Sequence, residues 1–194
     1  MFANTIIIDF ETTGLNPYHD DIIEIAAKVF GKDLSFSKLI KTTKTLEKKI
    51  VDITGITNNM LDAEGFERKE VYKEFGRFIV DACSWHNDSI EPIWILAHNG
   101  NSFDFIFFKQ ILKTLDYRPD FRFVDTISVS KYVNPRLYSH RLATLCHPKI
   151  YNVTNDTAHR ALSDVITTEK IFQKMIYHKF SSIEEVYNKI EFID

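Results

Sequence analysis

Two acidic residues interrupt a hydrophobic run near the start of the sequence. Asp9 and Glu11 stand in the segment TIIIDFETTGL, directly after three isoleucines. On a β-strand, side chains alternate between faces, so these two carboxylates project to the same face. Two like charges at that spacing repel, and a divalent cation removes the conflict; hard oxygen ligands suit Mg²⁺ or Mn²⁺. The alternative is a strand that ends in solvent, where both acids are harmless.

A third acid follows a second hydrophobic run. Asp104 closes the motif HNGNSFD, which comes directly after the apolar segment EPIWILA. The end of such a strand is a common place for ligand sites in sheets flanked by helices, and His98 and Asn99 are polar residues at the same end. The alternative is an ordinary helix start, capped by Asn101 or Ser102, with Asp104 favoured by the helix dipole.

A fourth acid lies on the apolar face of a predicted helix. At 100° per residue, Asp164 shares a face with Thr168, Ile171 and Phe172, and within the helix predicted at 161–177 no lysine or arginine stands one turn away on that face. A carboxylate that faces the core needs a partner. His159, five residues earlier, falls near the start of this helix, where a loop can aim it; alone, it is equally a surface or core histidine.

These residues together supply four carboxylates and one titratable base. That set suits phosphodiester hydrolysis by two cations about 3.5 to 4 Å apart, which activate a water and neutralise the leaving oxygen. A histidine with an ordinary pKa of about 6.5 can accept the proton of the water at neutral pH.

The elements that must position these residues follow from the hydrophobic pattern. Strands are predicted at about 5–10, 21–30, 34–43, 91–98 and 121–126, and helices at 67–82, 102–115, 125–132, 139–146, 161–177 and 182–190. The segment 53–66 is polar and turn-rich, with room for one short helical turn. This order indicates an α/β fold, a mixed five-stranded sheet flanked by helices, in a single domain over residues 1–194.

Composition limits the classes of protein. The chain has 194 residues, 44% of them hydrophobic, and a net charge of −3, so one domain can bury a large core. No apolar stretch reaches the roughly 18 residues that cross a bilayer, and no signal peptide is evident, so no membrane partner is expected. The two cysteines, Cys83 and Cys146, indicate ordinary thiols in a reducing compartment. We expect an intracellular protein, cytoplasmic or nuclear and not secreted.

Two segments are rich in basic residues, 37–50 and 136–149. Each is either a solvated face or a surface that attracts a polyanion. The mildly acidic net charge does not exclude nucleic acid, because bound cations would neutralise the carboxylates.

The motifs resemble the DEDDh family of 3′→5′ exonucleases, which has a ribonuclease-H-like fold. DFETTGL is similar to the first family motif, HNGNSFD to the second and HRALSD to the third. The supporting segments DIIEIAA, ITGITNNML and FVDTISVSKY also match, and the resemblance covers roughly residues 5–176. HNGNSFD and TAHRALSD are similar to the three-prime repair exonuclease branch, although Phe103 replaces a tyrosine of that branch.

The resemblance implies that Asp9, Glu11, Asp104 and Asp164 hold two Mg²⁺ or Mn²⁺ ions and that His159 is the general base. Asp9 and Glu11 would contact the metals most closely, and Asp104 would act through water.

The resemblance also implies contacts with the substrate. The candidate residues are Thr12, Thr13, Gly14, Leu15, Ile56, His98, Asn99 and Phe103. Leu15 would pack on the base of the terminal nucleotide, Asn99 and Phe103 would line the path of the next one, and Ile56 would contact a base.

The predicted function is a metal-dependent 3′→5′ exonuclease that releases nucleoside monophosphates from single-stranded nucleic acid. DNA is the favoured substrate and RNA the alternative. A catalytically silent module that binds nucleic acid or a polymerase on the same fold is the competing hypothesis, and a structural cation site without turnover is the third. A second copy of the chain or a polymerase is left open as a partner.

Overall fold

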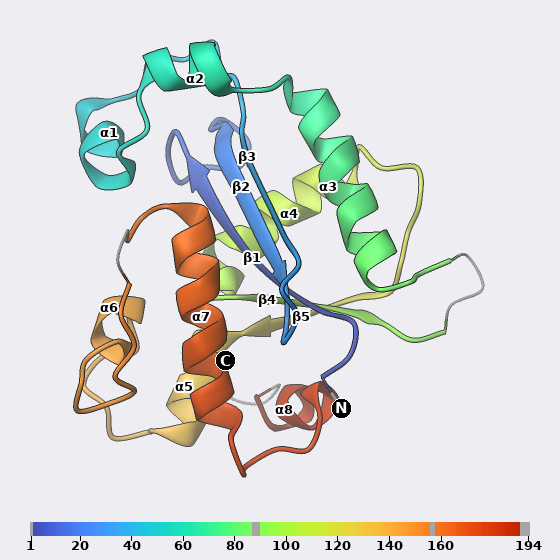
Figure 1. Cartoon of the computed structure of the whole chain (residues 1–194), viewed down its shortest axis with the longest axis vertical. Helices are drawn as coiled ribbons and strands as arrows, with labels where there is room; N and C mark the ends of the chain where they lie inside the picture. The colour runs from blue at the N-terminus through green and yellow to red at the C-terminus, as the bar shows by residue number, and fades with distance from the viewer. Residues whose placement is uncertain (1, 87–89, 156–157, 191–194) are drawn as a thin grey trace.

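A five-stranded mixed sheet forms the centre of the molecule. The computed structural model describes residues 2–86, 90–155 and 158–190 (Figure 1). The strands, in the sheet order β3-β2-β1-β4-β5, are β3 (Ser35–Leu39), β2 (Ile22–Val29), β1 (Thr5–Thr12), β4 (Ile93–Ala97) and β5 (Phe121–Asp125). The first three strands pair antiparallel, whereas β4 runs parallel to both β1 and β5. The predicted mixed five-stranded sheet is confirmed.

Helices cover both faces of this sheet (Figure 1). They are α1 (Lys48–Thr54), α2 (Asn58–Glu64), α3 (Arg68–Ala82), the short 3₁₀ turn η1 (Gly100–Ser102), α4 (Asp104–Leu112), α5 (Thr126–Val133), α6 (Leu142–Leu145), α7 (Ala161–Ile176) and α8 (Ile183–Ile190). Residues of α3 and α4 share one core with one face of the sheet, and residues of α5, α6, α7 and α8 share a second core with the other face. Among the described residues, no helix is both long enough and apolar enough to cross a membrane.

Strand β1 carries the alternation that places the acids. Ile6, Ile8 and Phe10 are buried in the core shared with α3 and α4, and Ile7 is buried in the core on the α7 side. Because side chains alternate along a strand, Asp9 and Glu11 continue the row that Ile7 begins. The two acids therefore project toward α7, as the spacing predicts.

Helix α7 packs its apolar face on β1 and β2. Val165, Ile171, Phe172 and Met175 are fully buried in the core on this side of the sheet. Asp164 lies in the first turn of the same helix and is buried among them, with 8% of its surface exposed. The predicted amphipathic helix with an acid on its core face is confirmed.

The segment between β3 and α3 contains more helix than predicted. It forms two short helices, and the hydroxyl of Thr57 caps α2 by accepting a hydrogen bond from the Met60 backbone at 3.2 Å. The polar composition of residues 53–66 predicts room for one short helical turn. The helices form because Leu46, Ile56 and Leu61 bury their side chains against Ile23 of β2 in a small separate core, which local sequence does not reveal.

One other detail differs from the expected fold. The predicted helix at 102–115 is a 3₁₀ turn followed by the shorter α4, and the N-cap position of α4 is Phe103 instead of Asn101 or Ser102. In the basic segment 37–50, Lys38, Lys44 and Lys48 each pair with a nearby acid, which favours the solvated-face interpretation for that segment. Cys83 is buried, Cys146 is half-buried and both are free thiols, as expected.

Candidate active site

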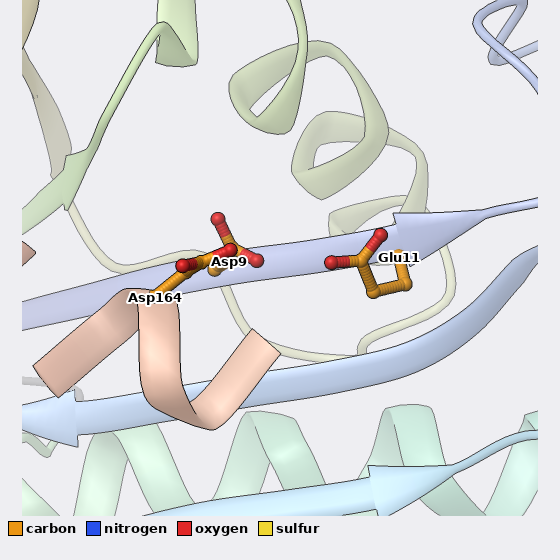
Figure 2. Close-up of side chains that lie close together, drawn as sticks. All are labelled: Asp9, Glu11 and Asp164. Atoms are coloured by element: carbon orange, nitrogen blue, oxygen red, sulfur yellow. The ribbon is translucent and has the colours of Figure 1, made fainter. Parts of the chain in front are cut away.

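Three of the predicted acids lie close together where the C-terminal half of β1 faces the first turn of α7. Figure 2 shows Asp9 and Glu11 on the strand, with Asp164 approaching from the first turn of the helix. One carboxylate oxygen from each residue lies within 4.8 Å of the other two. The sheet supplies two ligands at fixed spacing and the helix supplies the third, so the group is preorganised by two packed elements.

The carboxylates in this cluster hold their protons unusually tightly. Burial, followed by repulsion from Asp104 and Glu11, raises the pKa of Asp9 well above its ordinary value. Burial and repulsion from Asp164 raise the pKa of Glu11 to about 8, and burial also raises the pKa of Asp164. At neutral pH the cluster is therefore incompletely ionised unless a cation compensates its charge.

The fourth acid, Asp104, lies outside this group of three. Its side chain is 2% exposed, and its Oδ1 accepts a hydrogen bond of 3.1 Å from the backbone N–H of Phe10. Burial raises the pKa of Asp104 to about 8, although the bond from Phe10 opposes the shift. Among the charges that act on Asp9, that of Asp104 is the strongest. The charge of Asp104 therefore acts on the cluster, although its carboxylate is not one of the three that lie within 4.8 Å of one another.

Asp164 finds its partners in the loop before α7. Its Oδ1 accepts a hydrogen bond of 2.6 Å from the Asn155 side chain, and its Oδ2 accepts one of 3.0 Å from the backbone N–H of His159. Ser163 in turn donates to Asn155 at 2.8 Å. These bonds fix the orientation of the carboxylate. Asn155 was not predicted, because nothing local in its loop marks it.

His159 stands exposed in the loop directly before α7. Its φ of 63° is in the left-handed region, which few non-glycine residues adopt. The bond from its backbone to Asp164 holds this conformation. His159 lines the same cleft as Asp9 and Asp164, so the structure brings the predicted base and the acids to one surface.

That cleft, of about 810 Å³, is the space in which a ligand could lie. It is lined by Asp9, Leu15, His98, Asn99, Ser102, Phe103, Leu142, Ala143, Cys146, Asn155, Ala158, His159 and Asp164. Four of the predicted substrate residues, Leu15, His98, Asn99 and Phe103, are in this set. The side chain of Leu15 is 83% exposed and available for contact.

Thr12, Thr13 and Gly14 build the turn that presents Leu15. Thr12 donates its hydroxyl proton to the Gly14 carbonyl at 2.5 Å, and Thr13 donates to Asp20 at 3.2 Å. A side chain at Gly14 would lie 2.5 Å from the Asp20 carboxylate. None of these three residues is among those that line the cleft, so their contacts with a substrate stay predictions.

Ile56 is a correction. The sequence predicted that it contacts a base, but its side chain is fully buried and packs in the small core of Ile23, Leu46 and Leu61. An isoleucine in a polar, turn-rich segment can be either a surface contact or the anchor of that segment. Here it is the anchor, and no base can reach it.

Asp125, which the sequence analysis missed, holds the loop that carries Asn99. Its carboxylate accepts hydrogen bonds from the backbone N–H groups of Asn99 and Asn101, both at 3.0 Å, and caps α5 through Ile127 at 2.8 Å. Asn99 adopts a left-handed φ of 67° in this loop. An aspartate between a strand and a helix is a signal for a helix cap. Nothing in the sequence indicates that it also binds the loop after β4.

His98 is fixed from the same side. Its Nδ1 lies 2.9 Å from the hydroxyl of Thr126, and burial lowers its pKa to about 4. His98 therefore lines the cleft as a neutral side chain at pH 7.

The sequence analysis also missed a pair of residues beside the cluster, Glu24 and Arg160. The Arg160 guanidinium donates to both oxygens of Glu24, at 3.2 and 2.9 Å. A carboxylate inside the apolar run DIIEIAA was a signal of the same kind as Asp9, and it could have been found in the same way.

Comparison with known proteins decides the family. The exonuclease (RNase T) family matches residues 6–172, which is most of the chain. The chain belongs to this exonuclease family. The expected enzyme class, an exonuclease and therefore a hydrolase, is confirmed, and the site is that of a metal-dependent member with Asp9, Glu11 and Asp164 as its acidic cluster.

Curated relatives of this exonuclease-family chain include long polymerases. The chain is 31% identical over 190 residues to a PolC-type DNA polymerase III of Oceanobacillus iheyensis, with 96% of this chain and 12% of the polymerase aligned. A PolC-type polymerase of Thermotoga maritima is also 31% identical, with 98% and 14% aligned. The chain therefore spans about an eighth of the length of these relatives.

Solved structures show the same fold. Exonuclease I of E. coli, in a zinc-bound complex with single-stranded DNA, superposes with a TM-score of 0.73 at 19% identity over 97% of this chain and 42% of that one. Exonuclease X, in complex with 5′-overhanging duplex DNA, gives 0.66 at 20% identity over 96% and 99%. The predicted ribonuclease-H-like exonuclease fold is confirmed. These comparisons do not single out the three-prime repair branch, and that finer assignment stays a prediction.

Proposed function

We propose that this chain is a metal-dependent 3′→5′ exonuclease that removes nucleoside monophosphates from the 3′ end of single-stranded DNA. The observation that carries the proposal is the meeting of Asp9, Glu11 and Asp164 beside a cleft that Asp9, Asp164 and His159 line. The names of the relatives, which are DNA polymerases, and of the DNA complexes of exonucleases I and X support DNA. RNA is the alternative substrate.

The donor set fits divalent cations. Carboxylate oxygens are the hard ligands that Mg²⁺ and Mn²⁺ prefer. Burial, followed by repulsion among the neighbouring carboxylates, raises the pKa values of Asp9 and Glu11, and a bound cation would favour their ionised forms. We assign Asp9, Glu11 and Asp164 as direct ligands of two ions, with Asp104 acting through water. When bound, such ions polarise the phosphate and increase the acidity of a water.

The protein side chains would then carry out three tasks. His159, exposed at the edge of the cleft, accepts the proton of the attacking water. Asp164 keeps the backbone of His159 in place through the bond to its N–H group. Asn155 donates to the Oδ1 of Asp164, while the backbone of His159 donates to the Oδ2, so the two bonds together orient that carboxylate.

Apolar and polar groups in the cleft suit the terminal nucleotides. Leu15 and Phe103 offer apolar surface on which bases can pack, Asn99 offers hydrogen bonds, and the neutral His98 adds an uncharged side chain to the wall of the cleft. Leu142 and Ala143 of α6 line the cleft, and Arg141 directly precedes them in the sequence. Arg141 and the other exposed basic residues of segment 136–149 provide positive charge for the phosphates of the remaining strand.

Several broader expectations stay predictions. Residues 1–194 form a single exonuclease domain that acts inside the cell, in the cytoplasm or nucleus. A DNA polymerase and a second copy of this chain are the two partners left open. Of the activity of the much longer relatives, only the exonuclease reaction is proposed for this chain. Thr157, part of the TAHRALSD motif, lies outside the described residues.

The test is end-resolved digestion of single-stranded DNA. With Mg²⁺ or Mn²⁺, a 3′-labelled oligonucleotide should release labelled mononucleotide first, whereas a 5′-labelled one should shorten step by step. Asp9→Ala should abolish both. Asp62→Ala, which removes an exposed acid of α2, should leave both unchanged.

Three outcomes would contradict the proposal. Intact DNA that nonetheless binds the protein would favour the silent nucleic-acid-binding module. Release of label from the 5′ end first would reverse the direction. Faster digestion of a matched ribo-oligonucleotide would replace DNA by RNA as the substrate.

A further inference from the structure

Glu24 is a buried carboxylate placed against the acidic cluster. It lies on β2 directly opposite Glu11 of β1, and its side chain is 3% exposed. Its charge adds to the repulsion that raises the pKa of Glu11 and of Asp9. A fifth acid at this point makes the electrostatics of the site worse, so another interaction must offset its cost.

Arg160 provides that interaction. Its guanidinium donates to both oxygens of Glu24 at 3.2 and 2.9 Å, and the backbone N–H of Ala161 donates to Glu24 at 3.1 Å. A bidentate arginine–carboxylate pair fixes both distance and orientation. Glu24 therefore binds the side chain of the residue that precedes α7 and the first backbone group of the helix itself.

Arg160 and Ala161, which Glu24 holds in place, are close in sequence to His159 and Asp164. Arg160 directly follows His159, whose left-handed backbone sets where its ring lies. The backbone carbonyl of Arg160 also accepts a hydrogen bond of 3.1 Å from the backbone N–H of Asp164. The pair thus joins the first turn of α7 to the strand beside Asp9 and Glu11.

A second pair joins the same two elements at a distance from the site. Lys28 of β2 pairs with Glu169 of α7 at 2.7 Å, and Glu169 also accepts a hydrogen bond of 2.7 Å from the backbone of Gly31. Each pair thus has one carboxylate that binds one basic side chain and one backbone N–H. The Lys28–Glu169 pair is a natural control for a purely structural role.

We propose that Glu24 and Arg160 are positioning residues for the exonuclease reaction, which hold His159 and Asp164 at their working distance from Asp9 and Glu11. The proposal rests on the proposed function for its kinetic consequences. The Lys28–Glu169 pair fastens the same helix without this role. Loss of residues that orient metal ligands typically lowers metal affinity or activity about 10- to 100-fold.

The experiment compares two sets of variants in the full chain. One set is Glu24→Gln, Arg160→Gln and the double variant, and the other is Lys28→Gln, Glu169→Gln and their double variant. Both sets should lower the thermal midpoint. Only the first should lower kcat, by about 10- to 100-fold with a smaller change in KM, and the Glu24/Arg160 double variant should lose no more than the worse single variant.

Mn²⁺ titration by calorimetry gives a readout that does not need activity. Arg160→Gln removes a positive charge near the cluster, so charge alone predicts tighter Mn²⁺ binding. The positioning role predicts the opposite, about 10-fold or more weaker binding, with Lys28→Gln unchanged.

The outcomes separate the two proposals. Equal kcat for both sets, or tighter Mn²⁺ binding by Arg160→Gln, would overturn the positioning role. If the wild-type chain digests no nucleic acid, the proposed function fails, and weaker Mn²⁺ binding by Arg160→Gln still supports positioning of the acids.

Discussion

At the scale of single residues, the proposed base is separate from the acids proposed to bind metal. His159 lines the cleft, but the ligand group of Asp9, Glu11 and Asp164 does not include it. Its contact with that group is made by its backbone, which donates to Asp164. The imidazole can therefore be removed without removing a metal ligand, which makes its role testable on its own.

His159→Ala should lower kcat by about 10²- to 10⁴-fold, the usual worth of a general base, while Mn²⁺ affinity stays within a factor of two or so because the ligands remain. Steady-state digestion and calorimetric Mn²⁺ titration measure the two effects. The matched control is His178→Ala, an exposed histidine with a left-handed φ of 57° just after the other end of α7. An equal loss of Mn²⁺ affinity in His159→Ala would show that the residue is a ligand instead.

What the sequence could predict about residues depended on local pattern. The two-residue spacing of Asp9 and Glu11 and the helical position of Asp164 fix the faces on which these acids lie, and the structure places them accordingly. Asn155 could not be found, because a loop residue becomes a partner only through the tertiary fold. Ile56 was misplaced because apolar character alone does not distinguish a small core from a binding surface.

At the scale of elements, the cleft depends on the loops that follow the strands. Buried acids hold these loops in place by accepting hydrogen bonds from their backbone N–H groups. The segment after β4 is held by Asp125, which accepts backbone hydrogen bonds from Asn99 and Asn101 of that segment and from Ile127 of α5. Long elements with clear periodicity, such as β1 and α7, were predicted to within a few residues. Helices α1 and α2 were largely missed because their burial depends on contacts with β2 and not on a periodic pattern of their own.

Asp125→Ala should lower the free energy of unfolding by about 2 to 4 kcal/mol, because it removes a helix cap and two further hydrogen bonds to a buried charge. It should also raise KM, since the backbone of Asn99 loses its tether to β5. Urea unfolding and steady-state kinetics measure the two changes. Thr57→Ala, which removes only the cap of α2, should cost about 1 kcal/mol with KM unchanged. Unchanged KM in Asp125→Ala would contradict the proposed loop role.

At the scale of the whole molecule, the fold concentrates carboxyl groups at one end of an otherwise apolar interface between sheet and helix. Burial raises the pKa of Glu11 and of Asp104 to about 8, far above the ordinary carboxyl value. In the folded state these groups keep protons that the unfolded chain has already released at neutral pH. The stability of the protein is therefore linked to pH and to metal.

Without divalent metal, the thermal midpoint should fall as pH rises from about 5 to 8, because the unfolded chain binds fewer protons than the folded one across that interval. Saturating Mg²⁺ should raise the midpoint, and most strongly at pH 8, where cations replace the missing protons. Scanning calorimetry with and without chelator measures both effects. Glu11→Gln should flatten the dependence on pH, whereas Asp62→Asn, at an exposed site, should not. A metal-free midpoint that rises across this interval and is unaffected by Glu11→Gln would contradict the raised pKa values.

The most direct test of the central claim is anomalous diffraction from crystals of the protein grown with Mn²⁺ and a short single-stranded oligonucleotide. The account predicts Mn²⁺ peaks in contact with Asp9, Glu11 and Asp164. The phosphate that links the 3′-terminal nucleotide to the strand should lie beside these peaks, with His159 facing it. Mn²⁺ peaks elsewhere, with these three carboxylates free of metal at saturating Mn²⁺, would contradict it.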